Sequence, residues 1–204
     1  MTKKNRGMFI CVEGLDGSGK TTQAKRLVNN LRLRGFDSVY TTEPTKGEVG
    51  RFIRRFVLNR DKRVPATLEA LLFAADRIDH VEKEITPFLK QDMVVVCDRY
   101  VHSSLAYQGA AGLNLEWVEY INQFVLKPNL SLLIDASTDV VVKRLKKKKT
   151  VMENAQNLKK VREIYMNLAQ KQHLTIIDGG KSINEVANNI LDVVLQRLKT
   201  KPKI

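Results

Sequence analysis

Cysteine is scarce in this sequence, with two residues among 204, and both Cys11 and Cys97 lie inside apolar runs. Two thiols in such surroundings argue against a disulfide framework and are typical of proteins from a reducing compartment. No apolar run approaches the ~18 residues that a membrane-spanning helix needs. The apolar stretch that follows the basic N-terminal residues is too short for a signal peptide. We therefore expect a cytoplasmic protein that has no membrane partner.

Aromatic residues make up only 6% of the chain, and the sequence lacks internal repeats and Gly/Ser-rich or Pro-rich linkers. Without a linker or a repeat, we expect a single domain that covers 1–204. Apolar residues account for 43%, which excludes an intrinsically disordered chain. The 35 Lys and Arg against 22 Asp and Glu give a net charge of +13. This charge favours an anionic partner, such as a nucleotide, a nucleic acid or an acidic membrane.

Short β-branched runs alternate along the chain with patterns that are typical of helices. We expect five strands, almost continuously apolar as in sheets covered on both faces, at 8–13, 38–42, 93–98, 130–135 and 174–178. Between them, apolar residues recur at helical spacing, first at Ala24, Leu27, Val28 and Leu31. This alternation predicts an α/β fold with a doubly wound parallel sheet flanked by helices.

The strongest motif is the run GLDGSGKT from Gly14 to Thr21, which matches the phosphate-binding pattern G-x4-G-K-[ST] in full. It lies between the first predicted strand and the first predicted helix, as this motif requires. Glycines let the backbone wrap a phosphate chain, and N–H groups of the loop and of the helix N-terminus then point at the phosphates. Lys20 would bind the β- and γ-phosphates, and the Thr21 hydroxyl would ligate Mg²⁺. The motif predicts nucleotide binding but leaves the reaction open.

A second polar site closes the third predicted strand at Asp98 and Arg99. A carboxylate at the end of a strand beside a phosphate loop can hold Mg²⁺, directly or through water. The neighbouring guanidinium can hold a phosphate through two parallel hydrogen bonds. The pair predicts an acceptor site next to the phosphate loop.

Several motifs, in this order along the chain, resemble those of the thymidylate kinases. They are found at 13–23, 42–44 (TEP), 72–77 (LFAADR), 98–109 (DRYVHSSLAYQG) and 176–179 (IIDG). The fourth is the most specific, because related nucleotide kinases seldom have S-S-x-A-Y-Q after D-R-Y. The resemblance implies the P-loop nucleoside monophosphate kinase fold, a short mobile lid at about 144–153 and a homodimer. It also implies transfer of the ATP γ-phosphate to dTMP with Mg²⁺, without a covalent enzyme intermediate.

The same resemblance implies how dTMP would be bound. The thymine base would be stacked on or hydrogen-bonded by Phe73, Arg77, Ser104 and Gln108. The sugar would lie against Tyr107, which disfavours a 2′-hydroxyl, and its 3′-hydroxyl would donate to Asp16. The acceptor phosphate would be held by Arg54 and Arg99.

The resemblance further implies the residues that act on ATP and in the reaction. ATP would be bound by Gly14, Gly17, Ser18, Gly19, Lys20, Thr21, Thr22 and Arg144. Mg²⁺ would be held by Thr21 and Asp98, and Glu43 would lie near the ion and the acceptor phosphate. Catalysis would rest on Asp16, Lys20, Glu43, Asp98 and Arg99.

Two features depart from the family pattern. Many members have an arginine before the Glu-Pro pair, where this chain has Thr42, and Lys46 is a candidate replacement. Members also supply a catalytic arginine either from the phosphate loop, where this chain has Gly17, or from the lid. The expected lid begins RLKKKK at Arg144 and lacks the usual Asp-Arg pair. The cation is then Arg144 or a following lysine, or it is absent and the run is a solvated loop.

Two other functions stay open at this point. One is a kinase for another nucleoside monophosphate on the same fold, against which the Tyr107-Gln108 and Phe73/Arg77 pairs favour dTMP. The other is a nucleic-acid-stimulated P-loop ATPase or a nucleic-acid-binding protein that uses the +13 charge. Because the basic residues are scattered and no nucleic-acid-binding signature is found, we expect no nucleic-acid partner.

Overall fold

The structure is a computed structural model that describes residues 7–58, 64–145, 155–172 and 174–200. One sheet of five parallel strands has the order β2-β3-β1-β4-β5. The strands are β1 (Met8–Gly14), β2 (Ser38–Thr42), β3 (Val94–Asp98), β4 (Leu130–Asp135) and β5 (Thr175–Asp178). The expected five-stranded parallel sheet is confirmed, and every strand begins and ends within one residue of its predicted bounds.

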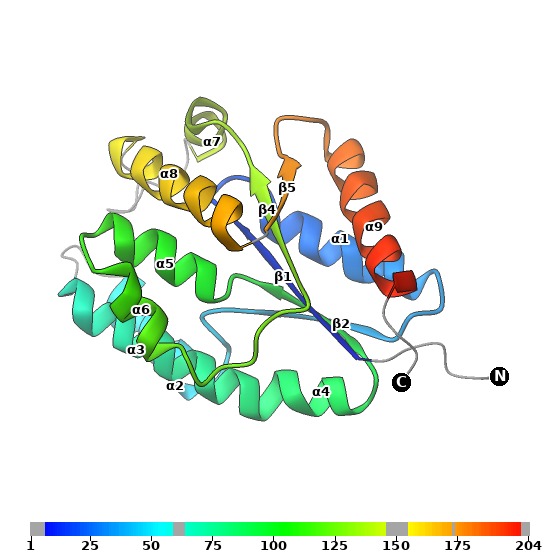
Figure 1. The fold of residues 1–204 in the computed structure, drawn as a ribbon, viewed down its shortest axis with the longest axis horizontal. Helices are drawn as coiled ribbons and strands as arrows, with labels where there is room; N and C mark the ends of the chain where they lie inside the picture. The colour runs from blue at the N-terminus through cyan, green and yellow to red at the C-terminus, as the bar shows by residue number, and fades with distance from the viewer. Residues whose placement is uncertain (1–6, 59–63, 146–154, 173, 201–204) are drawn as a thin grey trace.

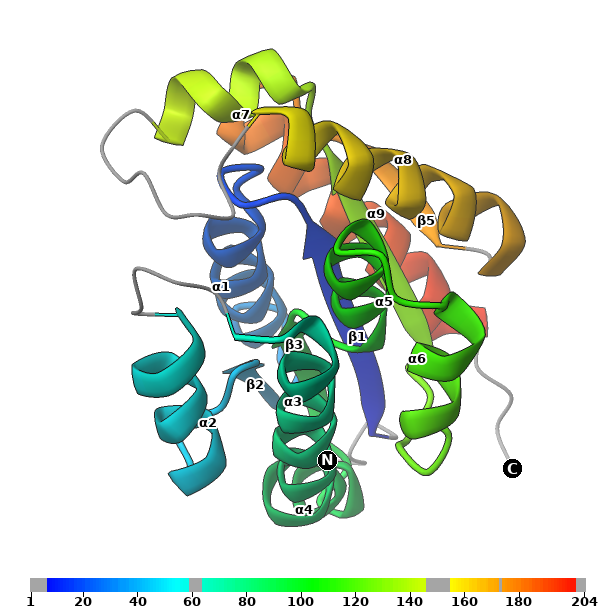
Figure 2. The ribbon, with the colours of Figure 1, turned by 90° about the vertical axis from the view of Figure 1, so that its left-hand side faces the viewer.

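Helices cover both faces of this sheet (Figures 1 and 2). On one face lie α1 (Lys20–Arg32) and α9 (Ile183–Thr200). The other face is covered by α4 (Thr86–Lys90), α5 (Val101–Ala110) and α8 (Ala155–Gln172). The remaining helices are α2 (Glu48–Ile53), α3 (Ala66–His80), α6 (Leu115–Ile121) and α7 (Thr138–Leu145). None of the helices in the described ranges is long and apolar enough to cross a membrane.

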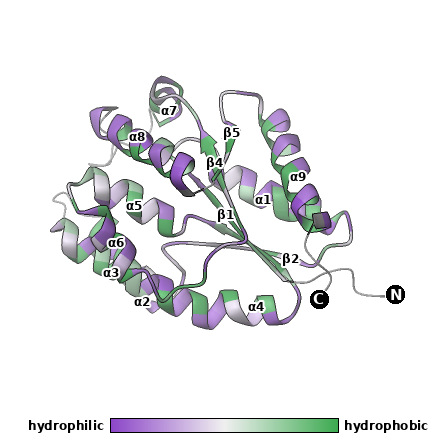
Figure 3. Cartoon of the chain, in the orientation of Figure 1, coloured by the Kyte–Doolittle hydropathy of each residue, from purple (hydrophilic) through white to green (hydrophobic). Residues whose placement is uncertain are grey.

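The central strand β1 divides its side chains between the two faces, because alternate residues of a strand point to opposite sides. Met8, Ile10 and Val12 pack against α1 and α9, whereas Phe9 and Cys11 pack on the opposite face. All of β1 is buried, so the hydrophobic colour in Figure 3 runs along the sheet and along the inward sides of the helices. This two-sided burial explains why the sequence of β1 is continuously apolar rather than alternating.

Two helical segments differ from the simple helices that the sequence pattern predicts. After α2 the chain forms a π-helical segment, η1 (Arg54–Leu58), and after α3 another, η2 (Val81–Ile85), leads into α4. The helix that begins with α3 at Ala66 therefore continues, through η2 and α4, to Lys90. Helical periodicity cannot detect a π-helical insertion, because one extra residue per turn shifts the apolar stripe without ending it.

The sheet order sets the place of the functional site. Parallel register places Val12 of β1 beside Asp98 of β3, and Gly14 beside Ile134 of β4. The carboxyl ends of the three central strands therefore meet at one edge, where the order of connections reverses on either side of β1. Open α/β sheets bind their ligands at such an edge. Most of the lid expected at 144–153 lies outside the described residues.

Candidate active site

The phosphate loop connects the end of β1 to the start of α1. Gly17 and Gly19 have φ values of 82° and 95°, which side-chain-bearing residues rarely adopt. A Cβ atom at Gly17 would approach the Leu145 side chain to 2.9 Å, whereas no atom lies within 4 Å of the Cβ position of Gly19. The loop thus packs tightly against α7 at Gly17, and its backbone is open at Gly19, where the N-terminus of α1 faces an incoming phosphate.

Lys20 is buried at the first position of α1, with 5% of its surface exposed. Its Nζ atom donates to the backbone oxygen of Leu15 at 3.2 Å and forms an ion pair of 3.2 Å with Asp16 Oδ1. Burial, and then the nearby Arg99, lower the pKa of Lys20 below its ordinary value, while Asp16 raises it in part. The structure thereby holds an ammonium group inside the loop, where it is desolvated and strongly attracted to an anion.

Asp98 at the end of β3 lies directly against Thr21 of α1. The Thr21 hydroxyl donates to Asp98 Oδ2 at 2.5 Å, and the Tyr40 hydroxyl lies 3.3 Å from the same oxygen. The other oxygen, Oδ1, is buried and has no hydrogen-bond partner among the described residues. A buried carboxylate oxygen in this position fits a divalent cation or a cation-bound water, so the pair that the sequence predicted for Mg²⁺ is brought together.

Arg99, Asp16 and Tyr107 form a cluster beside the phosphate loop. Arg99 Nη2 pairs with Asp16 Oδ1 at 2.5 Å, and the guanidinium lies 4.8 Å from the centre of the Tyr107 ring. Burial raises the pKa of Asp16, but Arg99 and Lys20 more than offset this and hold it below its usual range. Burial raises the pKa of Tyr107 to about 12, so its hydroxyl stays protonated and donates to Asp16 Oδ2 at 3.2 Å.

A cavity of about 140 Å³ opens next to this cluster. It is lined by Asp16, Pro44, Leu58, Glu69, Phe73, Arg99, Ser103, Ser104, Tyr107 and Gln108. Six of these are residues that the sequence predicted for dTMP. Gln108 Nε2 donates to Glu69 at 2.9 Å, and Gln108 Oε1 is buried with no partner in the described part of the chain. The cavity therefore combines an aromatic wall at Phe73 with a free amide oxygen and a cationic end at Arg99.

The two other predicted dTMP residues lie outside that lining. Arg77 is 1% exposed and its Nη2 atom lies 2.7 Å from Glu43 Oε2 and 3.1 Å from the Ser104 hydroxyl. Its Nη1 atom donates to Asn122 Oδ1 at 2.5 Å. Arg54 donates from both terminal nitrogens to the backbone oxygens of Pro44 and Thr45. Both guanidinium groups are thus held at the edge of the cavity, and their contacts with dTMP stay predictions.

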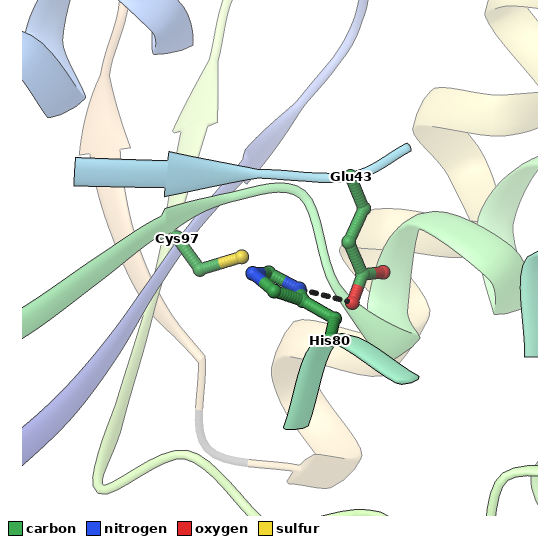
Figure 4. A group of neighbouring side chains, drawn as sticks. All are labelled: Glu43, His80 and Cys97. Carbon is green, nitrogen blue, oxygen red and sulfur yellow. Dashed lines mark hydrogen bonds and ion pairs between the residues drawn. The ribbon is translucent and has the colours of Figure 1, made fainter. Parts of the chain in front are cut away.

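Glu43 is the centre of a buried polar network behind the cavity (Figure 4). Its Oε2 atom is bound by Arg77, and its Oε1 atom lies 3.1 Å from His80 Nδ1. His80 Nε2 in turn lies 2.7 Å from the Thr41 hydroxyl. Although Glu43, His80 and Cys97 have ligand atoms within 4.8 Å of one another, both Glu43 oxygens are already bound and burial raises the pKa of the Cys97 thiol. The network therefore stabilises the cavity wall and does not resemble a metal centre.

A second cavity, of about 250 Å³, lies on the other side of the phosphate loop. It is lined by Gly17, Ser18, Gly19, Thr22, Gln23, Arg144, Gly179, Lys181, Ile183 and Val186. Arg144 reaches across it, with Nη1 at 3.4 Å from the Gly17 oxygen and Nη2 at 3.3 Å from the Gly179 oxygen. Arg144 thus lies at the predicted ATP site, whereas Lys146–Lys149 lie outside the described residues.

Sequence reasoning missed several residues of the site. The turn at Gly179 and the neighbouring Lys181 line the second cavity, although neither residue was predicted to bind ATP. Glu13 and Ser103, which support Arg99, were quoted only as letters of a motif. Their pairing with distant partners, such as Glu13 with Tyr165, joins residues 152 positions apart. No local pattern could have predicted that contact.

Comparison with known proteins agrees with this geometry. The sequence model of the thymidylate kinase family matches residues 12–190. A protein of Pyrococcus abyssi named "Probable thymidylate kinase" is 43% identical over 201 residues, covering 95% of this chain and 98% of the relative. Proteins with the same name from Pyrococcus horikoshii and Pyrobaculum calidifontis are 41% and 40% identical, covering 95% and 92% of this chain and 98% and 95% of their own lengths.

Proposed function

The chain belongs to the thymidylate kinase family, and we propose that it transfers the γ-phosphate of ATP directly to the phosphate of dTMP, giving dTDP and ADP. One observation carries the proposal. Lys20 of the phosphate loop and Arg99 of the acceptor cavity both bind the same atom, Asp16 Oδ1, at 3.2 and 2.5 Å. The cation of the phosphate loop and the cation of the acceptor cavity therefore meet at one point, as in-line transfer between two anions requires.

The chemistry that these residues perform is electrostatic. Two phosphates repel each other, and Lys20 and Arg99 supply positive charge on either side of the transfer point. A phosphate oxygen of dTMP is itself the nucleophile, so no side chain needs to form a covalent bond. Asp16 lies between the two cations and accepts hydrogen bonds from both, which holds them in place before the substrates bind. Its remaining capacity to accept supports a hydrogen bond from the 3′-hydroxyl.

We assign the Mg²⁺ site to Thr21 and Asp98. The unpartnered, buried Oδ1 atom of Asp98 supports this assignment, because a carboxylate oxygen without a donor is costly unless a cation or water reaches it. Mg²⁺ would supply charge neutralisation at the β- and γ-phosphates. Asp98 would hold the ion or its water, and the Thr21 hydroxyl would be released from Asp98 to ligate it.

Specificity for thymine and deoxyribose rests on the acceptor cavity. Phe73 supplies a face on which the base stacks, and Ser104 and Gln108 supply groups that hydrogen-bond its edge. Tyr107 lies against the sugar position, and its ring is fixed by Arg99 above it and by Tyr165, whose ring centre is 6.4 Å away. A fixed ring leaves no room for a 2′-hydroxyl, which supports preference for a deoxynucleotide.

We propose that Arg144 supplies the cation that the phosphate loop lacks. It reaches the loop from α7, and its contacts with backbone oxygens are long, at 3.3 to 3.4 Å. A guanidinium held by weak neutral acceptors can turn to a phosphate at small cost, because charge-assisted hydrogen bonds are stronger. Thr22 and Gly19 line the same cavity and support binding of the ATP phosphates.

A homodimer is proposed from an apolar stripe on α3. Leu68, Leu71 and Ile78 lie on one side of this helix and are 39% to 46% exposed. Clustered apolar side chains on a surface are typical of protein interfaces. Leu71→Glu is expected to convert a dimer to a monomer in light scattering, whereas Leu33→Glu, at an exposed leucine in the turn after α1, leaves the mass unchanged. Equal masses for wild type and Leu71→Glu would refute this interface.

We also propose that the protein works in the cytoplasm. Cys11 and Cys97 are free and buried, and burial raises the pKa of both thiols, so they stay reduced and unreactive. Two unpaired thiols on neighbouring strands suit a reducing compartment. Fractionation of cells followed by immunoblotting tests this location.

The function is tested by ATP-dependent ADP release with dTMP, dUMP, UMP, dCMP and AMP in parallel reactions. We expect the highest kcat/KM with dTMP and a loss of activity when Mg²⁺ is chelated. UMP should be the poorest of the three substrates that carry thymine or uracil, because Tyr107 excludes its 2′-hydroxyl. Equal or higher kcat/KM with any other monophosphate would refute the proposed substrate.

A further inference from the structure

Glu13, at the end of β1, is a fully buried carboxylate with three hydrogen-bond donors around it. The backbone N–H of Tyr100 donates to Oε1 at 2.9 Å. The hydroxyls of Ser103 and Tyr165 donate to Oε2 at 2.6 and 3.1 Å. A carboxylate with no exposed surface is tolerated only when it is fully hydrogen-bonded. Glu13 touches neither of the two cavities, so its place in the site needs another explanation.

The backbone of Arg99, next to Tyr100, has an unusual conformation. Its φ is +74°, a left-handed conformation that costs free energy in a residue with a side chain. Three hydrogen bonds hold the chain there. The Arg99 N–H donates to the Val12 oxygen at 3.0 Å, the Cys97 thiol lies 3.0 Å from the Arg99 oxygen, and the next N–H, of Tyr100, donates to Glu13. Glu13 therefore anchors the backbone immediately after the strained residue.

Glu13 also reaches the other end of Arg99, through one hydroxyl. Arg99 Nη1 donates to the Ser103 oxygen at 3.0 Å, while Ser103 donates its own proton to Glu13. Because Ser103 donates to Glu13, its lone pair is left free to accept from Arg99. The second terminal nitrogen, Nη2, is held by Asp16. One buried carboxylate thus fixes both the backbone and, through Ser103, the guanidinium of Arg99.

We propose that Glu13 is a positioning residue for phosphoryl transfer, which acts through Arg99 and never touches a substrate. The inference rests on the proposed function, in which Arg99 holds the acceptor phosphate. Loss of the carboxylate frees the Ser103 hydroxyl that holds Arg99 Nη1, and the guanidinium then turns away from the position that the phosphate occupies. The effect of Glu13 must therefore depend on the presence of a phosphate on the ligand.

The first test compares dTMP with thymidine, which lacks the phosphate, by calorimetric titration. Glu13→Gln keeps the shape of the side chain but places an amide NH₂ before one of the three donors. We expect about tenfold weaker binding of dTMP, the loss of roughly one charge-assisted hydrogen bond, and unchanged binding of thymidine. Asp135→Asn is the matched control, because Asp135 is also a strand-end carboxylate but binds Arg162 instead. It should bind both ligands as the wild type does.

The second test is a double-mutant cycle with Arg99→Lys. If Glu13 acts through Arg99, the effects of the two substitutions on kcat are not additive in free energy. Glu13→Gln should then alter kcat less than about threefold in a protein that carries Arg99→Lys. Thermal unfolding checks that each variant is folded. Should Glu13→Gln fail to fold, Glu13→Asp, which withdraws the carboxylate from its donors by one methylene, takes its place in both tests.

Four outcomes would overturn the inference. If Glu13→Gln weakens the binding of dTMP and of thymidine equally, Glu13 is a structural residue. The same conclusion follows if the effects of Glu13→Gln and Arg99→Lys on kcat multiply in full in the double-mutant cycle. Unchanged dTMP binding by Glu13→Gln would remove its role altogether. A wild-type protein that binds thymidine compounds but does not phosphorylate dTMP would refute the proposed function and this inference with it. The assay of the wild type alone distinguishes this result from a failure of the inference only.

Discussion

The two cavities beside the phosphate loop are built in different ways. The acceptor cavity is lined by side chains that are bound to one another, among them Arg99 with Asp16 and Gln108 with Glu69. The donor cavity includes Gly17, Gly19 and Gly179 in its lining, and Arg144 reaches over it through contacts of 3.3 to 3.4 Å. The side chains of the acceptor cavity are held in place before a ligand binds. In the donor cavity, Arg144 forms its strongest hydrogen bonds only when phosphates bind.

This difference follows from what each cavity must distinguish. A nucleoside monophosphate is recognised by its base and sugar, and discrimination between similar bases needs fixed polar groups in a desolvated cavity. A triphosphate is recognised mainly by its charge, and backbone N–H groups with one or two cations suffice for that. We therefore expect substitutions on the acceptor side to alter stability and specificity, and those on the donor side to alter rate.

The largest effect is expected where the two cavities meet, at Lys20. Lys20→Ala should lower kcat by about 10³-fold or more, because it removes the cation that faces the transferred phosphate. Its melting temperature should stay close to that of the wild type, because Lys20 serves the loop and not the core. Single-turnover kinetics and thermal unfolding measure the two effects. A folded Lys20→Ala protein that keeps most of its kcat would remove the phosphate-loop mechanism.

The next comparison contrasts one arginine from each side. Arg77→Met should lower the free energy of unfolding by about 3–5 kcal/mol, because it leaves Glu43 buried without its cation. Arg144→Met should change it by less than about 0.5 kcal/mol, because that guanidinium lies at the surface against neutral oxygens. Urea unfolding measures the free energy of unfolding of both variants. Similar losses of stability would mean that the donor side is as tightly built as the acceptor side.

Replacement of Arg144 by lysine should instead affect the rate. A lysine keeps the charge but loses the planar group that can bind two oxygens at once, so Arg144→Lys should lower kcat by about tenfold. The KM for dTMP should stay within about twofold, because the residue faces the other cavity. Steady-state kinetics at saturating ATP measure the change in kcat and the change in the KM for dTMP separately. A rise in the KM for dTMP with an unchanged kcat would place Arg144 on the acceptor side.

Specificity for the sugar should depend on Tyr107. Tyr107→Ala should narrow the preference for dTMP over its ribose analogue by about tenfold, because truncation opens the space that the ring fills. Tyr107→Phe serves as the control, since it keeps the ring and loses only the hydroxyl that binds Asp16. The ratio of kcat/KM for dTMP to that for its ribose analogue measures this preference in each variant. If Tyr107→Ala leaves the ratio as it is, the ring is only a core residue.

The smallest effect concerns the Asp16 carboxylate, which pairs with both Arg99 and Lys20. Arg99 and Lys20 hold the pKa of Asp16 below its ordinary value of 3.8, so its ionised form stabilises the folded state. That contribution is complete above the unfolded value and is lost as the pH falls through the lower, folded one. Asp16→Asn should therefore melt below the wild type by a few degrees at pH 7, and the gap should narrow as the pH falls below 3.8. A gap that is as wide at pH 2 as at pH 7 would assign the loss to packing.

The sequence predicted the local motifs of the site better than the networks that support them. The phosphate loop is a local motif, and Thr21 and Asp98 are brought together simply because neighbouring parallel strands end at the same edge. The strands were placed almost completely, since burial on both faces leaves a continuous apolar run. The acceptor network depends instead on contacts such as Glu43 with Arg77 and Glu13 with Tyr165. These join distant residues, so only the folded chain shows them.

The order of the cavity residues along the chain has a consequence for biosynthesis. All residues that line the acceptor cavity lie between Asp16 and Gln108, whereas the donor cavity is complete only when Ile183 and Val186 of α9 are present. A chain that emerges from the ribosome therefore exposes the acceptor residues well before the last wall of the ATP cavity is translated. Because α9 packs against α1 and supplies Ile183 and Val186, the second cavity is enclosed only after α9 has been made.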